Sequence, residues 1–371
     1  MTIIPKKGTK TYSELISCVI ESLGLERVFK ESKKVLIKPN FVTTKSSSEG
    51  VTTDINLVKH LVEAINAISN ADIVVGESAL LDTEETFKYL NVYEIGKAGC
   101  KIENFNKSEW VQVSSPFALL FKNLLIPKTA YQSDLIISVG KMKTHELTGV
   151  TLSIKNFMGL LSKGTRRYAH THDINKGIVD IYSYFEKNKK VVAIIDGLVG
   201  LAGKTGPIIG VPVKTDCLVA DTNAVRCDAA AVQLMGTDAS QIKHIKLASE
   251  VLGVDIQHSR TTTDIVNFDV PLTPAIKWFG INTWLLENIF YKYPIQKDSQ
   301  KCVSCKRCER ICPKHLVSVR ENRFSYDSSE CVHCLCCVEA CNTGSLACKI
   351  SNGWLYLFLR KVWALLKIVR K

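Results

Sequence analysis

The sequence predicts an α/β fold for residues 1–270, with a mostly parallel sheet covered by helices on both faces. Two observations support this prediction. Short apolar runs rich in Val and Ile alternate along the chain with segments of helical periodicity. The runs are apolar almost throughout, as in strands buried on both sides, and the helices between them provide the connections that parallel strands need.

The elements follow one another in a regular order. The predicted strands cover residues 35–40, 71–78, 133–140 and 191–197. Between and after them, helical patterns cover residues 54–69, 83–98, 147–161, 175–187 and 239–252. Asp82, with Glu85 three residues later, predicts a capped start for the second of these helices.

Length and composition divide the chain further. The 371 residues suggest roughly two or three domains, and 46% apolar with 23% charged residues excludes wholesale disorder and collagen-like repeats. After the α/β domain (1–270) we expect an aromatic-rich linker helix (271–296), a small cysteine-rich α+β domain (297–348) and a basic amphipathic tail helix (349–371). The net charge of +12 favours acidic partners without choosing among them.

The tail carries its apolar and basic side chains on opposite faces. Leu355, Phe358 and Val362 begin an apolar stripe, and residues 360–371 contain five basic and no acidic side chains. This pattern favours a helix lying on an anionic membrane, although it also suits a helix docked on the protein or on a partner subunit. Because the N-terminus has no apolar signal core, we expect a cytoplasmic protein, attached peripherally to the inner face of the cell membrane.

Ten of the 14 cysteines lie between Cys302 and Cys348. Two runs there share the spacing C-x2-C-x2-C-x3-C, and the second begins 29 residues after the first. The first run is Cys302, Cys305, Cys308 and Cys312, and the second is Cys331, Cys334, Cys337 and Cys341. In a chain that is not exported, clustered cysteines indicate metal rather than disulfides.

This spacing is typical of iron–sulfur clusters, because a tight loop brings three thiolates to one cluster while the fourth cysteine points at the other cluster. The segment resembles the bacterial two-[4Fe–4S] ferredoxin module. We therefore expect one cluster on Cys302, Cys305, Cys308 and Cys341, and a second on Cys331, Cys334, Cys337 and Cys312. Zinc is the alternative, but zinc sites usually take four ligands from paired C-x2-C knuckles.

Two positions depart from that module. Asn342 stands where a proline usually follows the eighth cysteine. Cys336, beside Cys337, is an additional thiol: a small residue packed near a cluster, an alternative ligand, or the donor of an S–H contact that tunes the potential. We favour the first interpretation.

In the α/β domain, polar residues gather near the ends of the predicted strands. Lys38 and Asn40 end the first strand, and open α/β sheets bind ligands outside the carboxyl ends of their strands. Lys38 can instead extend its ammonium group to solvent there. A dense group of polar residues follows the strand 133–140: Lys141, Lys143, His145, Lys155 and Asn156. We expect Thr144 or His145 to begin the next helix, whose positive end would favour an anion. Gly159 would permit close approach.

Two carboxylates complete this candidate site. Asp196 is expected in a glycine-rich turn at the end of the strand 191–197, and Asp228 lies further on. Each is a candidate base or cation ligand, and the alternatives are a turn carboxylate and a helix cap. Residues 200–205 look like a phosphate-binding P-loop, but Leu198 occupies the position that requires glycine, so nucleotide binding by this route is rejected.

The α/β segments are similar to a known family. The resemblance is to the uncharacterised family numbered 362 among the domains of unknown function, across roughly residues 30–255, and it is carried by VLIKPNFV, ADIVVGESA, VGKMKTHELTGVTLSIKNFMG, AIIDGLVGLAGKTGP and ADTNAVRCDAAAVQLMG. That family is often fused to a two-cluster ferredoxin module. The resemblance implies an iron–sulfur-associated oxidoreductase, and it favours the polar residues named above as the site.

We therefore expect an iron–sulfur oxidoreductase that passes electrons through two [4Fe–4S] clusters to an anionic substrate or cofactor. His145, Lys141 and Asp196 are the candidate catalytic residues, and the candidate binding residues are Lys38, Asn40, Lys143, Lys155, Asn156 and Asp228. The alternatives are a non-catalytic electron-transfer subunit on a membrane-associated partner and a non-redox enzyme with structural clusters. We expect a redox partner protein and no nucleic acid, because no reading module is recognisable.

Overall fold

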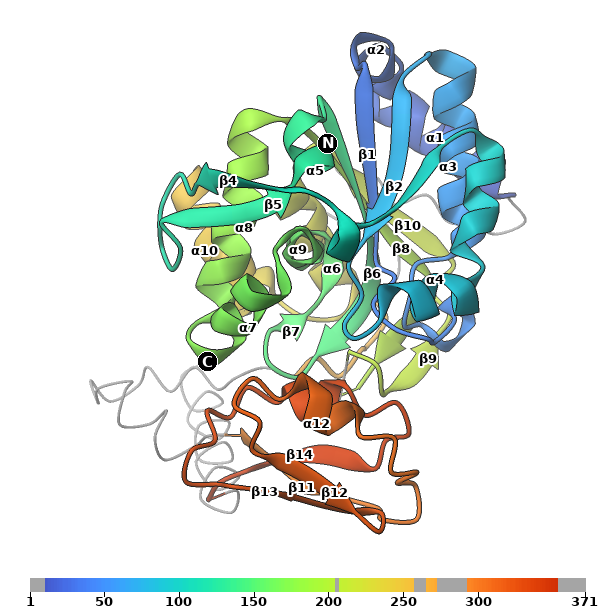
Figure 1. Ribbon diagram of the computed structural model, residues 1–371. Coiled ribbons are helices and arrows are strands. Elements are labelled where there is room, and N and C mark those ends of the chain that lie inside the picture. The colour runs from blue at the N-terminus through green and yellow to red at the C-terminus, as the bar shows by residue number, and fades with distance from the viewer. Residues whose placement is uncertain (1–10, 204–206, 257–264, 272–291, 353–371) are drawn as a thin grey trace, which may run out of the picture. The chain divides into compact units, whose positions relative to one another are not determined.

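The computed structural model describes residues 11–203, 207–256, 265–271 and 292–352 (Figure 1). It divides into two compact units, Met1–Leu272 and Thr273–Lys371, and each is described by itself. Within the described ranges, every helix is too short or too polar to cross a lipid bilayer.

The first unit is built on one large sheet, and the prediction of a mostly parallel sheet is confirmed. Its main strands, in spatial order, are β10 (Cys217–Asp221), β8 (Lys190–Ala202), β6 (Leu135–His145), β1 (Lys34–Pro39), β2 (Asp72–Glu77) and β3 (Lys101–Asn104). All neighbours run parallel except β10 and β8. The short strands β7 (Gly149–Val150) and β9 (Val211–Val213) add to β6 and β8.

The strand order reverses between β1 and β6. From β1 the chain builds outward through β2 to β3, and it then returns to the other side of β1 with β6. In open α/β sheets, ligands bind outside the carboxyl ends of the strands at such a reversal. The fold therefore directs attention to the ends of β1 and β6.

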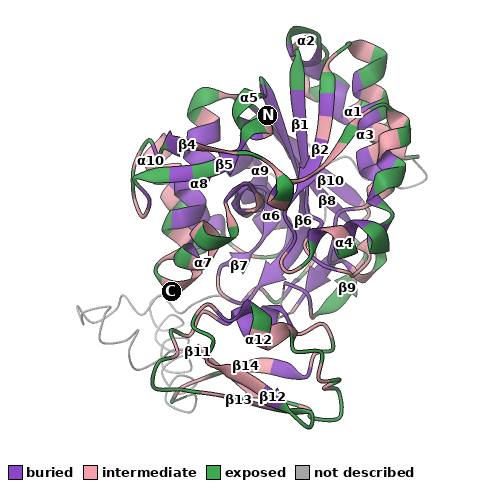
Figure 2. Ribbon diagram, viewed as in Figure 1, coloured by how far each residue is buried: buried purple, intermediate pink, exposed green. Residues whose placement is uncertain are grey.

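Helices cover both faces of this sheet, as predicted (Figure 1). One apolar core includes side chains of α1 (Tyr12–Leu23), α2 (Leu25–Glu31), α3 (Ile55–Ile68), α4 (Thr83–Leu90) and η2 (Val92–Ala98). The other includes α6 (Leu152–Asn156), η4 (Phe157–Leu160), α8 (Ile174–Asn188), α9 (Ala224–Leu234) and α10 (Lys243–Leu252). Figure 2 shows the strands almost wholly buried between these layers, with exposed residues on the outer helix surfaces. The remaining elements of this unit are β4 (Trp110–Ser114), β5 (Asn123–Pro127), α5 (Lys128–Gln132), α7 (Lys163–Thr171), η1 (Ser47–Glu49), η3 (Phe105–Lys107) and η5 (Ala239–Gln241).

The helix predicted over residues 147–161 is wrong. The segment contains β7, the short helix α6 and the turn η4, and His145 belongs to strand β6 rather than to a helix start. Gly149 (φ 79°) and Leu152 (φ 50°) both adopt left-handed backbone conformations, which interrupt a helix. The helix predicted over residues 83–98 is likewise broken at Asn91 (φ 56°), while Asp82 caps its start by accepting a hydrogen bond from the Glu85 N–H at 3.0 Å.

The second unit is small and contains two antiparallel strand pairs. β11 (Lys292–Gln296) pairs with β14 (Leu346–Ile350), and β12 (Val317–Arg320) pairs with β13 (Arg323–Tyr326). Its described residues also contain the short helices α12 (Arg307–Ile311) and α13 (Cys336–Glu339). The end of the predicted linker helix is wrong, because residues 292–296 form a strand; the rest of that helix from 272 onward, and the tail from 353, lie outside the described residues.

Candidate functional site

The two cysteine runs fold into the same loop. Ser304 and Lys306 have left-handed φ angles of 49° and 57°, and His333 and Leu335, 29 residues later, have 53° and 55°. In both runs the second of these residues immediately precedes a short helix, α12 or α13. Left-handed residues alternating with others curl the chain so that successive N–H groups can face one anion. The sequence repeat is therefore also a conformational repeat.

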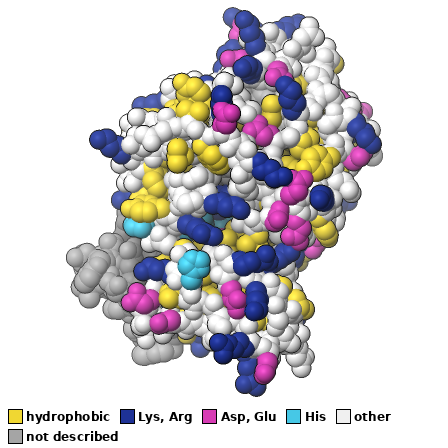
Figure 3. Space-filling view, viewed as in Figure 1, with side chains coloured by type: hydrophobic (Ala, Val, Ile, Leu, Met, Phe, Trp, Pro, Cys, Tyr) yellow, Lys and Arg dark blue, Asp and Glu magenta, His cyan; other side chains and the backbone are white. Residues whose placement is uncertain are grey.

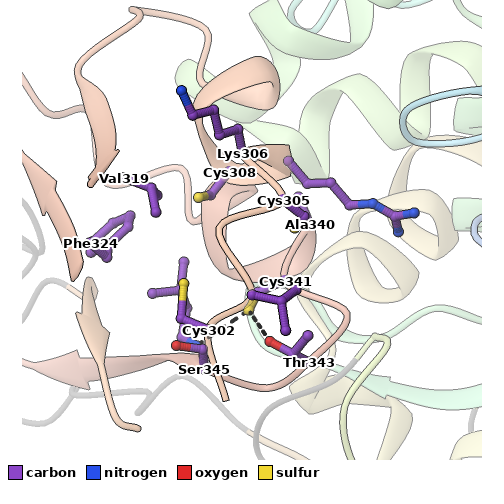
Figure 4. A pocket seen from close by; sticks show the side chains of 13 residues that line it. Cys302, Cys305, Lys306, Cys308, Val319, Phe324, Ala340, Cys341, Thr343 and Ser345 are labelled. Atoms are coloured by element: carbon purple, nitrogen blue, oxygen red, sulfur yellow. Dashed lines mark hydrogen bonds between the residues drawn. The ribbon is translucent and has the colours of Figure 1, made fainter. Parts of the chain in front are cut away.

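The first predicted quartet lines a single pocket (Figure 4). Cysteines from both runs meet there with apolar side chains of β12 to β14: Cys302, Cys305, Cys308, Cys341, Val319, Phe324 and Leu346. Among the described residues, no three His, Cys, Asp or Glu side chains converge as they would around one metal ion. Four thiols around a shared space suit a [4Fe–4S] cluster, which takes four cysteine ligands.

The second predicted quartet is also brought together. Burial raises the pKa of the Cys331 thiol, and the neighbouring Cys334 and Cys312 raise it further. The pKa of Cys337 is raised mainly by burial, and it is raised further by Cys334, Cys331 and Cys312 together with Cys308 of the first quartet. These mutual effects require proximity, so the fourth cysteine of the first run lies with the first three of the second.

Each crossing cysteine also accepts a backbone hydrogen bond. The Leu316 N–H donates to Cys312 Sγ at 3.4 Å, and the Leu346 N–H donates to Cys341 Sγ at 3.4 Å. Hydrogen bonds to cysteine sulfur are one way in which a protein sets the potential of a bound cluster. The additional thiol of Cys336 is buried beside Cys334 and lowers the pKa of Cys334 by hydrogen bonding to it.

In the first unit, the predicted residues at the β1–β6 reversal form a buried polar network. Lys38 Nζ donates to Glu77 Oε2 at 2.6 Å and to Asn156 Oδ1 at 3.3 Å. Asn40 Nδ2 donates to the same Asn156 oxygen at 3.2 Å, and Lys143 Nζ donates to Asn40 Oδ1 at 2.8 Å. The chain of contacts thus runs continuously from Glu77 to Lys143, and all five side chains are buried.

Burial and crowding shape the Lys38–Glu77 pair. Burial lowers the pKa of Lys38, whereas the Glu77 carboxylate opposes that shift. A Cβ atom at Gly159 would lie 2.6 Å from Glu77 Oε1 and 2.7 Å from Lys38 Nζ, so the expected close approach at this glycine is confirmed. Glu77, which ends β2, is the member of the network that sequence analysis missed. An acidic residue at the end of a predicted buried strand was the available signal.

A second buried ion pair lies next to this network. Lys141 Nζ donates to Asp196 Oδ2 at 2.8 Å, and the backbone N–H of Asp54 donates to the same oxygen at 2.9 Å. The expected position of Asp196 in a turn is wrong. It lies inside β8, directly opposite Lys141 on β6, because β8 continues to Ala202.

Asp228 on α9 caps a helix, which was the alternative to its being a base or a cation ligand. Its carboxylate accepts hydrogen bonds from the Ser153 N–H at 2.8 Å, from the Ile154 N–H at 3.0 Å and from the Ser153 hydroxyl. These are the first N–H groups of α6, which begins at the strained Leu152. Burial raises the pKa of Asp228 to about 7, against the opposing effect of these hydrogen bonds.

The two remaining candidates, His145 and Lys155, differ in how far they are buried. His145 ends β6 and is wholly buried, and its Nδ1 accepts a hydrogen bond from the Leu147 N–H at 3.1 Å. Because Nδ1 is an acceptor, the proton of the neutral ring is on Nε2. Lys155 on α6 is partly exposed. On the viewed face, Lys and Arg side chains are spread over the surface with Asp and Glu among them (Figure 3).

The two units together define an iron–sulfur protein in which a cluster-binding domain is joined to an α/β domain with a buried ionic site. The comparisons identify both parts. The chain belongs to the family "Domain of unknown function (DUF362)", whose profile matches residues 35–233. A 4Fe-4S dicluster domain matches residues 301–345 of the same chain.

Individual relatives are distant. An uncharacterised protein of Methanocaldococcus jannaschii, MJ0749, is 37% identical over 65 residues, 17% of this chain and 25% of that protein. The thylakoid-associated protein sll1697 of Synechocystis sp. is 21% identical over 238 residues, 62% of this chain and 72% of that protein. The uncharacterised ferredoxin MJ0722 of M. jannaschii is 32% identical over 57 residues, 14% of this chain and 74% of that protein. The match thus spans a quarter of the length of the first of these relatives.

Proposed function

We propose that this protein is an iron–sulfur oxidoreductase that passes electrons through two [4Fe–4S] clusters to an anionic substrate or cofactor bound in the α/β unit. The observation that carries the proposal is the convergence of Cys302, Cys305, Cys308 and Cys341, from both runs, on one cavity. Cys331, Cys334, Cys337 and Cys312 would hold the second cluster. When bound, such clusters supply one-electron transfer.

The ionic site supports an anionic ligand. Lys38, Lys141 and Lys143 come from strands on either side of the β1–β6 reversal, where α/β sheets bind ligands. Buried ammonium groups attract negative charge strongly, because little water screens them. Glu77 and Asp196 hold two of these lysines in place, so the ammonium groups are positioned before a ligand arrives.

His145 is the candidate acid or base within this site. It lies four residues beyond Lys141 on the same strand, and its Nδ1 is fixed by the backbone as an acceptor. The proton on Nε2 is therefore the one that the ring can donate. Imidazole suits proton transfer near neutral pH, which a reduction that consumes protons requires.

An anaerobic titration tests this proposal. The clusters are reduced, excess reductant is removed, and cluster absorbance and EPR are followed while pooled anionic metabolites are added. We expect one fraction to reoxidise the clusters, and we expect Lys143→Met to abolish that response. Lys97→Met, at an exposed lysine, is the matched control. Clusters that a chemical oxidant reoxidises but no fraction does would contradict the enzyme and favour an electron-transfer subunit.

That second function, an electron-transfer subunit at a membrane surface, is favoured by two observations. The tail contains five basic and no acidic residues between positions 360 and 371, and one relative is named for its association with thylakoids. The test is flotation of the full chain with phosphatidylglycerol vesicles, compared with a variant in which these five residues are glutamine. Equal flotation of both proteins would contradict attachment through the tail.

A further inference from the structure

His244, in the first turn of α10, is buried without a visible reason. Its side chain is wholly inaccessible, and among the described residues neither Nδ1 nor Nε2 has a hydrogen-bond partner. A buried polar group without a partner is destabilising, and such groups in native proteins generally meet a water or a ligand. The two unpartnered ring nitrogens therefore make His244 a candidate to bind a ligand.

Two residues of the candidate site, His145 and Lys155, lie near this ring. Gly149 pairs with His145 across β6 and β7, and a Cβ atom at Gly149 would lie 2.9 Å from the side chain of Ile242, two residues before His244. Burial, aided by electrostatic effects of Lys155 and His145, lowers the pKa of His244 to about 3. His145, Lys155 and His244 therefore lie near one another, although they come from β6, α6 and α10.

We propose that His244, His145 and Lys155 together bind an oxyanion, the carboxylate or phosphate group of the ligand that the α/β unit takes. This inference rests on the proposed function for the existence of an anionic ligand, and it adds a residue that no sequence motif marked. The neutral His244 ring donates through one nitrogen, His145 donates through Nε2, and Lys155 supplies the positive charge.

The surroundings favour this class of ligand. The amino end of α10, a helix of ten residues, carries partial positive charge beside His244. Lys155 is the member of the group that reaches the surface, so the oxyanion would enter from its side. A cation is disfavoured, because the ammonium group of Lys155 would repel it.

The test uses the complete cluster-loaded protein, with potassium phosphate and potassium acetate as probes and potassium chloride at matched ionic strength as the control. We expect a saturable rise in Tm of about 3 °C with at least one oxyanion and none with chloride. His244→Leu should abolish the rise while leaving the Tm without anion unchanged or higher, because it removes an unpartnered polar group. His60→Gln, at a partly exposed histidine of α3, should behave like the unaltered protein.

A second measurement needs no variant. In protein labelled with 15N-histidine, the ring resonances of His244 should shift on addition of the stabilising anion, whereas those of His60 should not. No saturable rise with either anion, an equal rise in His244→Leu, or an unmoved His244 resonance would overturn the inference. If an anionic metabolite reoxidises the clusters but none of these effects is seen, the inference is wrong and the proposed function is supported. If the anion binds at His244 but no metabolite reoxidises the clusters, the inference is supported and the proposed function is contradicted.

Discussion

The two units of this protein use buried polar groups in opposite ways. In the α/β unit, two extensive apolar cores enclose the sheet, and the buried charges between them are matched by other side chains, as Lys38 is by Glu77. Among the described residues of the cluster unit, few apolar side chains are buried, and cysteines line the space between the loops. The interior of the α/β unit is filled mainly by its own side chains, whereas we expect the cluster unit to depend on bound iron–sulfur clusters.

The largest predicted effect distinguishes two adjacent cysteines of the cluster unit. Both Cys336 and Cys337 are buried, but only Cys337 is an expected ligand. Cys337→Ala should lose about half of the bound iron, because it removes one thiolate from a four-thiolate site. Cys336→Ala should keep its iron, which is measured together with acid-labile sulfide. Equal iron in both variants would show that Cys336 can replace its neighbour, and it would overturn our interpretation of Cys336 as a packing residue.

The next effect is expected from the α/β unit. Lys38→Met leaves the Glu77 carboxylate buried without its partner, which should lower the free energy of unfolding by about 3–5 kcal/mol. The double variant Lys38→Met/Glu77→Met should recover most of that loss. Lys97→Met, which breaks the exposed pair with Glu94, should have no resolvable effect in the same denaturant titration. If Lys38→Met unfolds with the same free energy as the unaltered protein, the Lys38–Glu77 pair does not contribute to stability as we expect.

A smaller effect is predicted for the glycine beside this pair. Gly159→Ala places a methyl group against Lys38 and Glu77, and it should destabilise the α/β unit by about 1–3 kcal/mol. Gly164→Ala, in helix α7 with no atom near its added Cβ, should stabilise the protein slightly. If the two variants unfold alike, the close packing at Gly159 is not what selects glycine there.

The last prediction concerns the dependence of stability on pH. Burial raises the pKa of Asp228 from its ordinary value near 3.8 to about 7, so the folded state holds this proton more tightly than the unfolded state. Its contribution to stability is therefore full below pH ~4, falls by at most about 1.4 kcal/mol per pH unit as the pH rises toward 7, and is then constant. Asp228→Asn should flatten the dependence of Tm on pH in that window, whatever its overall stability. If the dependence of Tm on pH is unchanged in Asp228→Asn, a group other than Asp228 causes it.

The same contrast explains what the sequence could predict. The spacing of the cysteines is a local pattern, and it was sufficient to predict which four of them line the first cavity. The apolar strands were also predicted, because strands buried on both faces leave long apolar runs, as in residues 135–139 of β6. In both cases the deciding information lies within a short stretch of chain.

The ionic site depended on information that is not local. Lys141 and Asp196 pair because β6 and β8 lie side by side, 55 residues apart in the chain. The predicted helix over residues 147–161 failed because the Asp228 carboxylate, from α9, fixes the turn in which α6 begins. His244 lies on a helix without a motif, and only its burial without a partner makes it visible.

The proposed function depends most directly on the two clusters. One measurement tests them: the iron and acid-labile sulfide content of the anaerobically reconstituted protein, with its low-temperature EPR spectrum after reduction. We predict eight iron and eight sulfide per chain, as two four-iron clusters require, and the spectrum of two interacting reduced clusters. About four iron per chain, or zinc in place of iron, would contradict the assignment on which the proposed function rests.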